Sequence, residues 1–352
     1  MKEIRTVDAV GQVLCHDLTQ IIRGVTKDAR FRKGHVIKPE DIDVLLSMGK
    51  DHIFVWDAGE DVVHEDEAAE VLRMLLTGAP RDDMAHMEAK GPKEGKIELV
   101  ATVDGVFSVD VARIDALNDL DDVSIATVPQ HFPVKAGQKL AGMRVIPLAC
   151  RKSVLEEAKR RAGDESQPIV RIAPYRKDLR VGVVTTGTEV YLGRIKDTFT
   201  PVLAAKLKAF GLDIAEQRKA DDDKAHIEAE IRALLDAGMD LVLCTGGMSV
   251  DPDDRTPAAI RAVATDVMTY GAPILPGAMF LLAYEERDGR TVPILGLPGC
   301  VMYAPATVLD MYLPRLIAGE RIDRAAIRKK GVGGLCLNCD VCHYPRCTCG
   351  RS

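Results

Sequence analysis

The sequence predicts an α/β layered fold, and most of the support comes from residues 179–320. Short apolar runs rich in β-branched residues, at 180–186 and 240–244, alternate there with amphipathic segments of helical period. Such alternation is typical of a sheet with helices packed against it. Ligands of these folds bind beyond the carboxyl ends of the strands, so the loops that follow the strands are the first candidates for function.

The α/β region contains the expected elements in strict alternation. Each helix is expected to end at or near a glycine, or to begin at an acid or a proline, as helix boundaries usually do. The expected order is a strand at 180–186, a helix at 200–210, a strand at 212–217, a helix at 223–237, a strand at 240–244 and a helix at 257–263.

Size and composition are those of a soluble globular protein with more than one domain. The chain has 352 residues, of which 47% are hydrophobic and 28% are charged. The formal charge of −6 shows no excess of basic residues of the kind that binds a nucleic acid. The longest apolar runs are far shorter than a membrane span, and the charged start MKEIR lacks the apolar core of a signal peptide. We therefore expect a cytoplasmic protein with no nucleic-acid or membrane partner.

Composition and pattern divide the chain into five predicted parts. An α+β region at 1–93 and a β-rich domain at 94–150 come first, followed by a linker with a charged helix at 151–178. The α/β domain at 179–320 follows, and a basic linker with a cysteine-rich tail fills 321–352.

Within the first part, the pattern predicts a helix that begins near Asp41 and a short strand at His52–Trp56. Residues 81–95 are polar and contain two glycines and a proline. We expect them to form a linker or a loop.

Three loops of the α/β domain carry residues suited to binding an anion. Thr185–Glu189 offers hydroxyls, backbone amides and a carboxylate, Thr245–Asp254 joins Gly246-Gly247 to three acids, and Leu297–Cys300 precedes the last long helix. Glycines let the backbone approach a phosphate, and a following helix start favours negative charge. Acids beside a phosphate require a hard cation such as Mg²⁺ between them. Each loop alone is better interpreted as a simple turn, and only the order and spacing of the three loops together indicate function.

Taken in order, these motifs resemble the molybdopterin-binding domain shared by the molybdopterin adenylyltransferases and the molybdopterin molybdotransferases, which include the gephyrin E domain. The resemblance implies a three-layer α/β/α sandwich that holds the phosphate and the pterin of the cofactor over the loops, with acids serving Mg²⁺ binding and transfer. The matching elements are TTGTE at 185–189, the DDD run at 221–223, TGGMSVDPDDRTP at 245–257, PG at 276–277 and LPG at 297–299.

The resemblance also implies roles for individual residues. By position it gives catalytic or Mg²⁺-binding roles to Glu189, Asp222 and Asp254, and Asp251 stands where the molybdotransferases more often have glycine. The expected cofactor-binding residues are Thr185, Thr186, Gly187, Thr188, Thr245, Gly246, Gly247, Ser249, Asp251, Pro298 and Gly299.

Two departures from the molybdotransferase pattern leave more than one function open. The PGKP motif reads Pro276–Met279 here, which removes a lysine from a site that should hold an oxyanion. The LPGNP motif has Cys300 in place of asparagine, either as a soft ligand for a metal or as a small buried hydrophobe. We expect a protein that binds molybdopterin or molybdenum cofactor and inserts molybdate into adenylated molybdopterin. The alternatives are a non-catalytic carrier or sensor and an adenylyltransferase. We also expect a homo-oligomer and a molybdoenzyme acceptor.

Five of the nine cysteines lie in the tail, where the first three have C-x2-C-x2-C spacing. This pattern favours zinc or an iron–sulfur cluster, with disulfides and a disordered reactive end as alternatives. Glycines before the run should let it turn freely, and we expect no core residue of the α/β domain in the tail. Together with its tail, the chain resembles a cysteine-tailed subgroup of the molybdotransferase-like proteins. The favoured ligands are Cys336, Cys339, Cys342 and Cys347, with Cys349 or His343 as a spare or alternate ligand.

Overall fold

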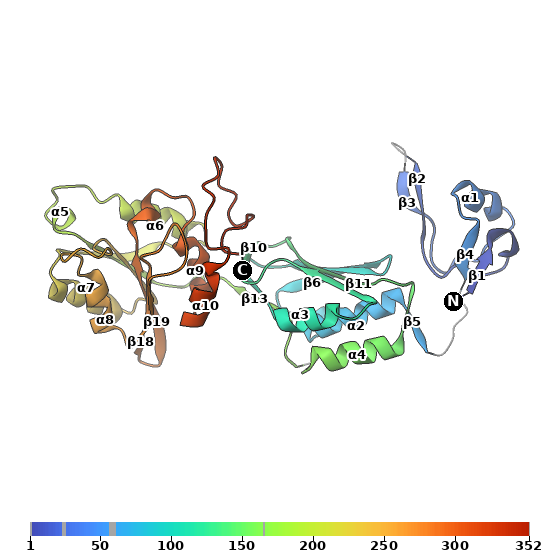
Figure 1. Ribbon diagram of the computed structural model, residues 1–352, viewed down its shortest axis with the longest axis horizontal. Helices are drawn as coiled ribbons and strands as arrows, with labels where there is room; N and C mark the ends of the chain where they lie inside the picture. Colours follow the sequence, from blue (N-terminus) through green and yellow to red (C-terminus); the bar gives the residue numbers. More distant parts are fainter. Residues whose placement is uncertain (1, 23–25, 56–60, 165, 352) are drawn as a thin grey trace. The chain divides into compact units, whose positions relative to one another are not determined.

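The computed structural model describes residues 2–22, 26–55, 61–164 and 166–351, and these form two compact units (Figure 1). Across these residues every helix is too short or too polar to span a bilayer. The first unit comprises Met1–Val103, Phe107–Gln130 and Val134–Ile172, and the second comprises Asp104–Val106, His131–Pro133 and Ala173–Ser352.

The start of the first unit is a small α+β arrangement. Strand β1 (Lys2–Arg5) pairs antiparallel with β4 (His52–Val55), and helix α1 (Asp41–Ser47) lies between them in the chain. Strands β2 (Leu18–Ile22) and β3 (Thr26–Phe31) form an antiparallel pair. The predicted helix near Asp41 and the strand from His52 are confirmed, whereas Trp56, the predicted strand end, lies outside the described residues.

The rest of the first unit is built on a four-stranded antiparallel sheet in the order β6-β7-β11-β9. Its strands are β6 (Met87–Lys93), β7 (Lys96–Ala101), β9 (Val123–Thr127) and β11 (Lys139–Val145). The remaining helices and strands up to Pro174 are η1 (Thr6–Asp8), β5 (Val62–His64), α2 (Glu65–Thr77), η2 (Arg81–Asp83), β8 (Gly105–Val109), α3 (Val111–Asn118), β10 (Phe132–Val134), β12 (Ala149–Arg151), α4 (Lys152–Ala162) and β13 (Val170–Pro174).

The prediction of a loop over residues 81–95 is wrong. Its second half is strand β6, which forms a hairpin with β7 through Glu94 and Gly95. Gly91 and Pro92 misled the sequence analysis because they usually interrupt strands. Here they fall in an irregular stretch between Lys90 and Lys93 on an edge strand, where a missing N–H leaves no ladder partner unsatisfied.

The second unit contains a six-stranded sheet in the order β15-β14-β16-β19-β18-β17. The first four strands in that order are parallel, and β18 and β17 extend the sheet as antiparallel strands. The strands are β14 (Val181–Thr186), β15 (Ile214–Ala220), β16 (Leu241–Thr245), β17 (Asp266–Tyr270), β18 (Leu281–Arg287) and β19 (Arg290–Leu297). The helices are α5 (Thr188–Tyr191), α6 (Phe199–Lys208), α7 (Lys224–Asp236), α8 (Thr256–Val263), η3 (Gly299–Met302), α9 (Val308–Ile317), α10 (Arg324–Arg328) and η4 (Lys329–Gly331).

Helices cover both faces of this sheet, so the predicted three-layer α/β/α sandwich is confirmed. Successive residues of a strand point to opposite faces. Along β14, Val183 is buried in a core with Leu203 of α6 and Leu313 of α9. Its neighbour Val184 is buried in a second core with Ile231 of α7. Burial on both faces explains why the sequences of these strands are continuous apolar runs.

The predicted basic linker at the start of 321–352 contributes to the core of the second unit. Ile322 and Ile327 of the predicted basic linker are fully buried in the core that contains α6 and α9. The backbone N–H of Ile322 also donates to the hydroxyl of buried Tyr284 at 2.8 Å. Arg321 pairs with Asp266 and Glu286 of the same unit. The basic run is therefore part of the domain.

Gly277 provides a test of how tightly the PG turn is packed against α9. It has a φ of 135°, and a Cβ at this position would lie 2.5 Å from the Cβ of Val308. We predict that Gly277→Ala lowers the free energy of unfolding by about 2–4 kcal/mol, because strain and overlap add. Gly289→Ala is the control, with a φ of 73° and open space around the new atom. It should cost about 1 kcal/mol. Urea unfolding measures both, and equal costs would contradict the packing argument.

Candidate functional site

The register of the parallel strands brings the predicted loops to one edge of the sheet. Thr185, near the end of β14, is paired with Thr245 at the end of β16, and Thr245 is paired with Leu297 at the end of β19. On the other side of β14, Thr186 is paired with Ala220, which precedes the DDD run. The loops that follow these strands therefore begin side by side, although they are far apart in the sequence.

Asp222 holds the first loop in place. One of its oxygens, Oδ2, accepts hydrogen bonds from the backbone N–H of Thr188 at 2.9 Å and from the Thr188 hydroxyl at 2.8 Å. Gly187 donates its N–H to the carbonyl of Ala220 at 3.2 Å. Glu189 follows in the short helix α5 and is exposed. Asp222 thus has a structural partner, whereas Glu189 faces solvent.

The glycine pair of the second loop is required by close contacts within the fold. Gly246 and Gly247 have φ values of 88° and 53°. A Cβ on Gly246 would collide with the carbonyl oxygen of Thr186, and one on Gly247 would lie 2.8 Å from the hydroxyl of Thr256. The second loop therefore packs directly on the first, and both backbones lie at the same spot at the edge of the sheet.

The hydroxyls of Thr185 and Thr186 bond inside the protein. Thr186 donates to the carbonyl of Thr245 at 3.0 Å and bonds the hydroxyl of Thr256 at 3.0 Å. Thr185 bonds Thr200 at 3.2 Å and accepts from Gln217 at 3.0 Å. Both residues stay predicted cofactor-binding residues, and their hydroxyls also stabilise the loop.

Asp197 is the centre of a polar cluster that the sequence analysis missed. It accepts hydrogen bonds from the Thr200 hydroxyl at 2.6 Å, from Gln217 at 2.7 Å and from the backbone N–H of Phe199 at 2.9 Å. Burial alone would raise the pKa of Asp197, but these hydrogen bonds outweigh it and hold the pKa below its ordinary value. In the sequence, the one local indication of this cluster was an acid just before the start of α6.

The hydroxyl of Thr245 has no hydrogen-bond partner among the described residues. Its side chain is only 1% exposed, and it lies at the end of β16, opposite Thr185. A buried hydroxyl is normally paired, because an unpaired one costs roughly 1–3 kcal/mol. A water molecule or a ligand atom at this edge of the sheet would satisfy it.

Tyr270 fixes the rest of the second loop. Its hydroxyl donates to the carbonyls of Met248 at 3.0 Å and Ser249 at 3.1 Å. Burial raises the pKa of Tyr270, so the hydroxyl stays protonated and able to donate. Beyond Ser249, Asp251 is exposed and Asp254 is half-buried, and the backbone N–H of Asp254 donates to the Asp251 carbonyl at 3.0 Å.

The third loop turns into η3 directly after β19. Pro298 is buried, Gly299 is exposed and Cys300 is half-buried. Burial raises the pKa of the Cys300 thiol, which favours the neutral form.

The predicted Mg²⁺ acids do not form a preformed metal cage. Across the described ranges, no three His, Cys, Asp or Glu side chains are grouped so that they could hold a metal ion. Mg²⁺ commonly keeps several waters and binds one or two carboxylates together with phosphate oxygens of a ligand. Glu189 is exposed and Asp254 is half-buried, so both remain accessible to solvent.

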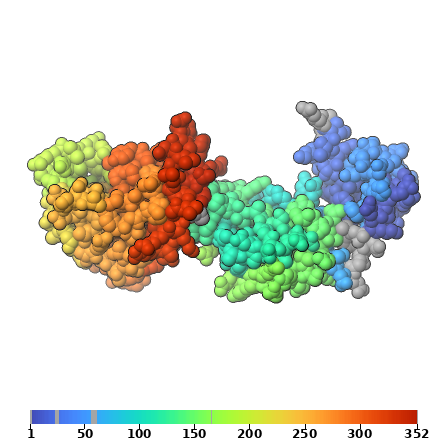
Figure 2. Space-filling view, viewed as in Figure 1, coloured from blue at the N-terminus to red at the C-terminus, as the bar shows by residue number. Residues whose placement is uncertain are grey.

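The cysteine-rich tail is folded against the α/β domain. The N–H of Leu275 donates to the Gly334 carbonyl at 2.9 Å, and the N–H of Cys336 donates to the Leu275 carbonyl at 2.8 Å. Figure 2 shows the last residues, in the darkest red, lying against the orange residues that precede them. The expectation of free turning is wrong, because a Cβ on Gly334 would collide with the carbonyls of Pro273 and Lys330.

All five tail thiols line one small cavity of about 80 Å³. Cys349 is buried, Cys336 and Cys347 are half-buried, and Cys339 and Cys342 are exposed. Burial raises the pKa of Cys349 to about 11, and the neighbouring thiols of Cys336 and Cys347 add to the shift.

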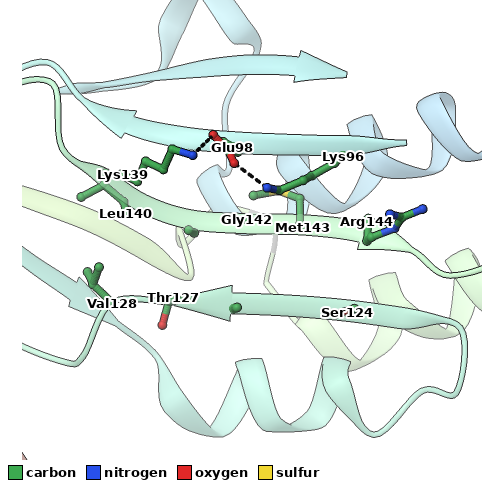
Figure 3. A pocket seen from close by; sticks show the side chains of 12 residues that line it. Lys96, Glu98, Ser124, Thr127, Val128, Lys139, Leu140, Gly142, Met143 and Arg144 are labelled. Carbon is green, nitrogen blue, oxygen red and sulfur yellow. Dashed lines mark hydrogen bonds and ion pairs between the residues drawn. The ribbon is translucent and has the colours of Figure 1, made fainter. Parts of the chain in front are cut away.

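A larger groove of about 480 Å³ lies on the four-stranded sheet of the first unit. Figure 3 shows Glu98 of β7 between Lys96 and Lys139. Glu98 pairs with both lysines, and these hydrogen bonds, first that of Lys139, lower its pKa to about 2. Arg144, at the end of the groove, lies 3.5 Å from Glu65. Lys96 and Lys139 therefore share a single acid, and Arg144 pairs with a second one.

The Asp197 cluster predicts a pH dependence of stability. Because the folded-state pKa of Asp197 is depressed, its stabilisation is present above the ordinary value of 3.8 and is lost as the pH falls through the folded-state value. We predict that Asp197→Asn costs about 1–2 kcal/mol at pH 7 and much less below pH ~3. Urea unfolding at both pH values measures this. Asp213→Asn, at an exposed surface pair, should change little at either pH. A pH-independent cost of Asp197→Asn would contradict the account.

Comparisons with known proteins agree with the resemblance noted from the motifs. Residues 182–318 match the model of a family described as probable molybdopterin binding domain, and residues 3–57 match a domain of unknown function (DUF8806). CinA-like proteins of Mycolicibacterium gilvum and Mycobacterium leprae are 42% and 40% identical over 77 residues, which cover 22% of this chain. The chain spans only 18% of the length of these curated relatives.

Similar solved structures include the molybdopterin biosynthesis enzyme MoaB of Thermus thermophilus and the protein CinA of Thermoplasma acidophilum. MoaB is 24% identical with a TM-score of 0.34, and the match covers 40% of this chain and 98% of that one. CinA is 20% identical with a TM-score of 0.33, and the match covers 40% of this chain and 99% of that one. The family match is a similarity of residues 182–318, the part of the chain that holds the six-stranded sheet.

Proposed function

We propose that the second unit binds molybdopterin or molybdenum cofactor and acts late in cofactor assembly, inserting molybdate into adenylated molybdopterin. The observation that carries the proposal is the alignment of three motif-bearing loops at the carboxyl edge of β14, β16 and β19, in a domain that matches the molybdopterin-binding family. Ligands of α/β sheets bind at this edge.

The second loop supplies the phosphate contacts in this proposal. The hydroxyls of Thr185 and Thr186 bond within the fold, so the first loop shapes the site more than it binds the ligand. Gly246 and Gly247 have no side chains, so their backbone amides at the edge of the sheet can approach a phosphate. The unpartnered hydroxyl of Thr245 lies in the residue directly before them and offers a further polar contact.

The acids divide into two roles. Asp222 is a positioning residue because it holds Thr188 through two hydrogen bonds. Glu189 and Asp254 are the acids assigned to Mg²⁺, shared with the phosphate of the ligand. The ion would neutralise the charge of the phosphate beside these acids. Molybdate transfer would then depend on positioning and electrostatic stabilisation, with no covalent intermediate on the protein.

The second candidate is a carrier or sensor that binds the cofactor without transfer. The observation that favours it is Ala278, which stands where the molybdotransferases have the lysine of PGKP. The preceding Gly277 is packed against Val308, so the turn itself is retained while the cation is lost. Adenylyltransfer is a third and weaker option, which nucleotide release from ATP would reveal.

The proposal includes further partners and a second metal. We propose that the tail binds zinc or an iron–sulfur cluster, favoured by the five thiols around one cavity. A molybdoenzyme that accepts the cofactor, a homo-oligomer and a cytoplasmic location also belong to the proposal.

Turnover of adenylated molybdopterin with molybdate and Mg²⁺ tests the enzyme. We predict that Asp254→Asn lowers the rate by about 10–100-fold, because a ligand of the ion is lost. Asp253→Asn removes an equal charge from the exposed neighbour and should change the rate less than about threefold. Binding without turnover in the wild-type protein would favour the carrier, and equal effects of the two variants would contradict the role of Asp254.

A further inference from the structure

Tyr303 is an aromatic residue of the second unit that the fold leaves in solvent. Its exposed fraction is 75%, whereas Tyr284 and Tyr312 of the same unit are only 1% exposed. Tyrosine is usually largely buried, because its ring contributes a large apolar surface. Its neighbours Val301 and Met302 pack into the core that contains α6 and α9. The chain therefore buries these two residues and presents the tyrosine to solvent.

The backbone of Tyr303 is fixed by hydrogen bonds within the turn after η3. The N–H groups of Tyr303 and Ala304 both donate to the carbonyl of Cys300, at 3.2 and 2.9 Å. The hydroxyl of Thr198, the residue directly before α6, donates to the sulfur of Met302 at 3.7 Å. The turn is thus held both to η3 and to the segment that precedes α6, so the tyrosine ring starts from a defined position.

The side chain of Tyr303 lies beside the third loop. A Cβ on Gly299 would be 3.4 Å from the hydroxyl oxygen of Tyr303, so the hydroxyl lies close to the backbone of the LPG motif. Gly299 is itself exposed, and the contact is therefore made on the solvent side of the loop. This contact places the tyrosine at the edge of the sheet where the three motif-bearing loops begin.

The third loop and the glycine pair of the second loop are neighbours at this edge. Thr245 at the end of β16 is paired with Leu297 at the end of β19. Neighbouring strands lie about 4.8 Å apart, so the next residues, Gly246 and Pro298, leave the sheet side by side. Adjacent loops thus present backbone amides suited to a phosphate and, through Tyr303, an exposed aromatic ring.

We propose that Tyr303 binds the planar ring of the ligand, which stacks on the tyrosine while its phosphate is held at Gly246-Gly247. This inference rests on the proposed function and names a residue that recognises the pterin. Aromatic side chains stack on flat heteroaromatic rings of many kinds, because every such ring has a π-face. The phosphate contacts alone would accept many phosphorylated molecules. The ring contact selects among them those that carry a flat ring.

An exposed tyrosine can also anchor a partner protein, because tyrosine is enriched at such interfaces. The contact with Gly299 favours the ligand, since ligands of α/β sheets bind at this edge. A ring used only by a protein partner would leave the affinity for the ligand unchanged when the ring is removed. Affinity measurements on variants of Tyr303 therefore separate the two uses.

Calorimetric titration of the full chain with molybdopterin and Mg²⁺ tests the ring contact. We predict that Tyr303→Leu weakens binding by about 5–10-fold, because leucine keeps apolar bulk but lacks a flat face. Tyr303→Phe keeps the ring and should weaken binding less than about twofold. Because the side chain is exposed, both variants should fold with the Tm of the wild type, which thermal unfolding checks.

The outcomes separate this inference from the proposed function. Equal affinities of the wild type and Tyr303→Leu would overturn the role of Tyr303 and leave cofactor binding intact. Absence of binding in the folded wild-type protein would overturn both.

The absorption spectrum of the bound ligand provides a second readout, which does not depend on affinity. At saturation, stacking should weaken the pterin band and shift it to longer wavelength in the wild type and in Tyr303→Phe. In saturated Tyr303→Leu the band should be that of the free ligand. A role of Tyr303 in shaping the third loop would change affinity without this spectral difference. The same band in all three proteins would therefore overturn the stacking.

Discussion

The whole candidate site depends on one constraint, the direct packing of the second loop on the first. Gly246 sits against the carbonyl of Thr186, and a side chain at this position would force the two loops apart. The parallel register of β14 and β16 places the loops beside each other, and the absence of a Cβ lets them touch. Because Asp222 and the Asp197 cluster fix the first loop from two sides, the backbone geometry at this edge is held before any ligand arrives.

The alternating pattern was sufficient to predict the α/β/α layers, because burial of a parallel sheet on both faces produces continuous apolar strands. The motif order also located the loops that the register brings together. The sequence did not reveal which side chains bond inside the protein. Gln217 reaches Thr185 from a neighbouring strand, and no local pattern indicates such a contact. The motif alone therefore gave no sign that the hydroxyls of Thr185 and Thr186 bond within the fold.

The contacts of the cysteine-rich tail were even harder to predict from the sequence than those of Thr185 and Thr186. Cysteine spacing indicated metal binding, but it carried no information on where the tail lies. Its position is set by Leu275, Asp310 and Pro273, which come from distant parts of the chain. Spacing favoured Cys339 over Cys349 as a ligand, and it gave no sign that Cys349 is buried while Cys339 is exposed. Local glycines suggested free turning, when they are needed for close backbone contacts.

A calorimetric titration of the full chain with molybdopterin in the presence of Mg²⁺ tests the central claim most directly. The account predicts saturable binding of one ligand per chain that weakens sharply when Mg²⁺ is removed, because acids and phosphate then repel each other. Heat that is absent with Mg²⁺ in excess, from protein shown to be folded, would contradict the assignment of this edge of the sheet to a phosphorylated pterin.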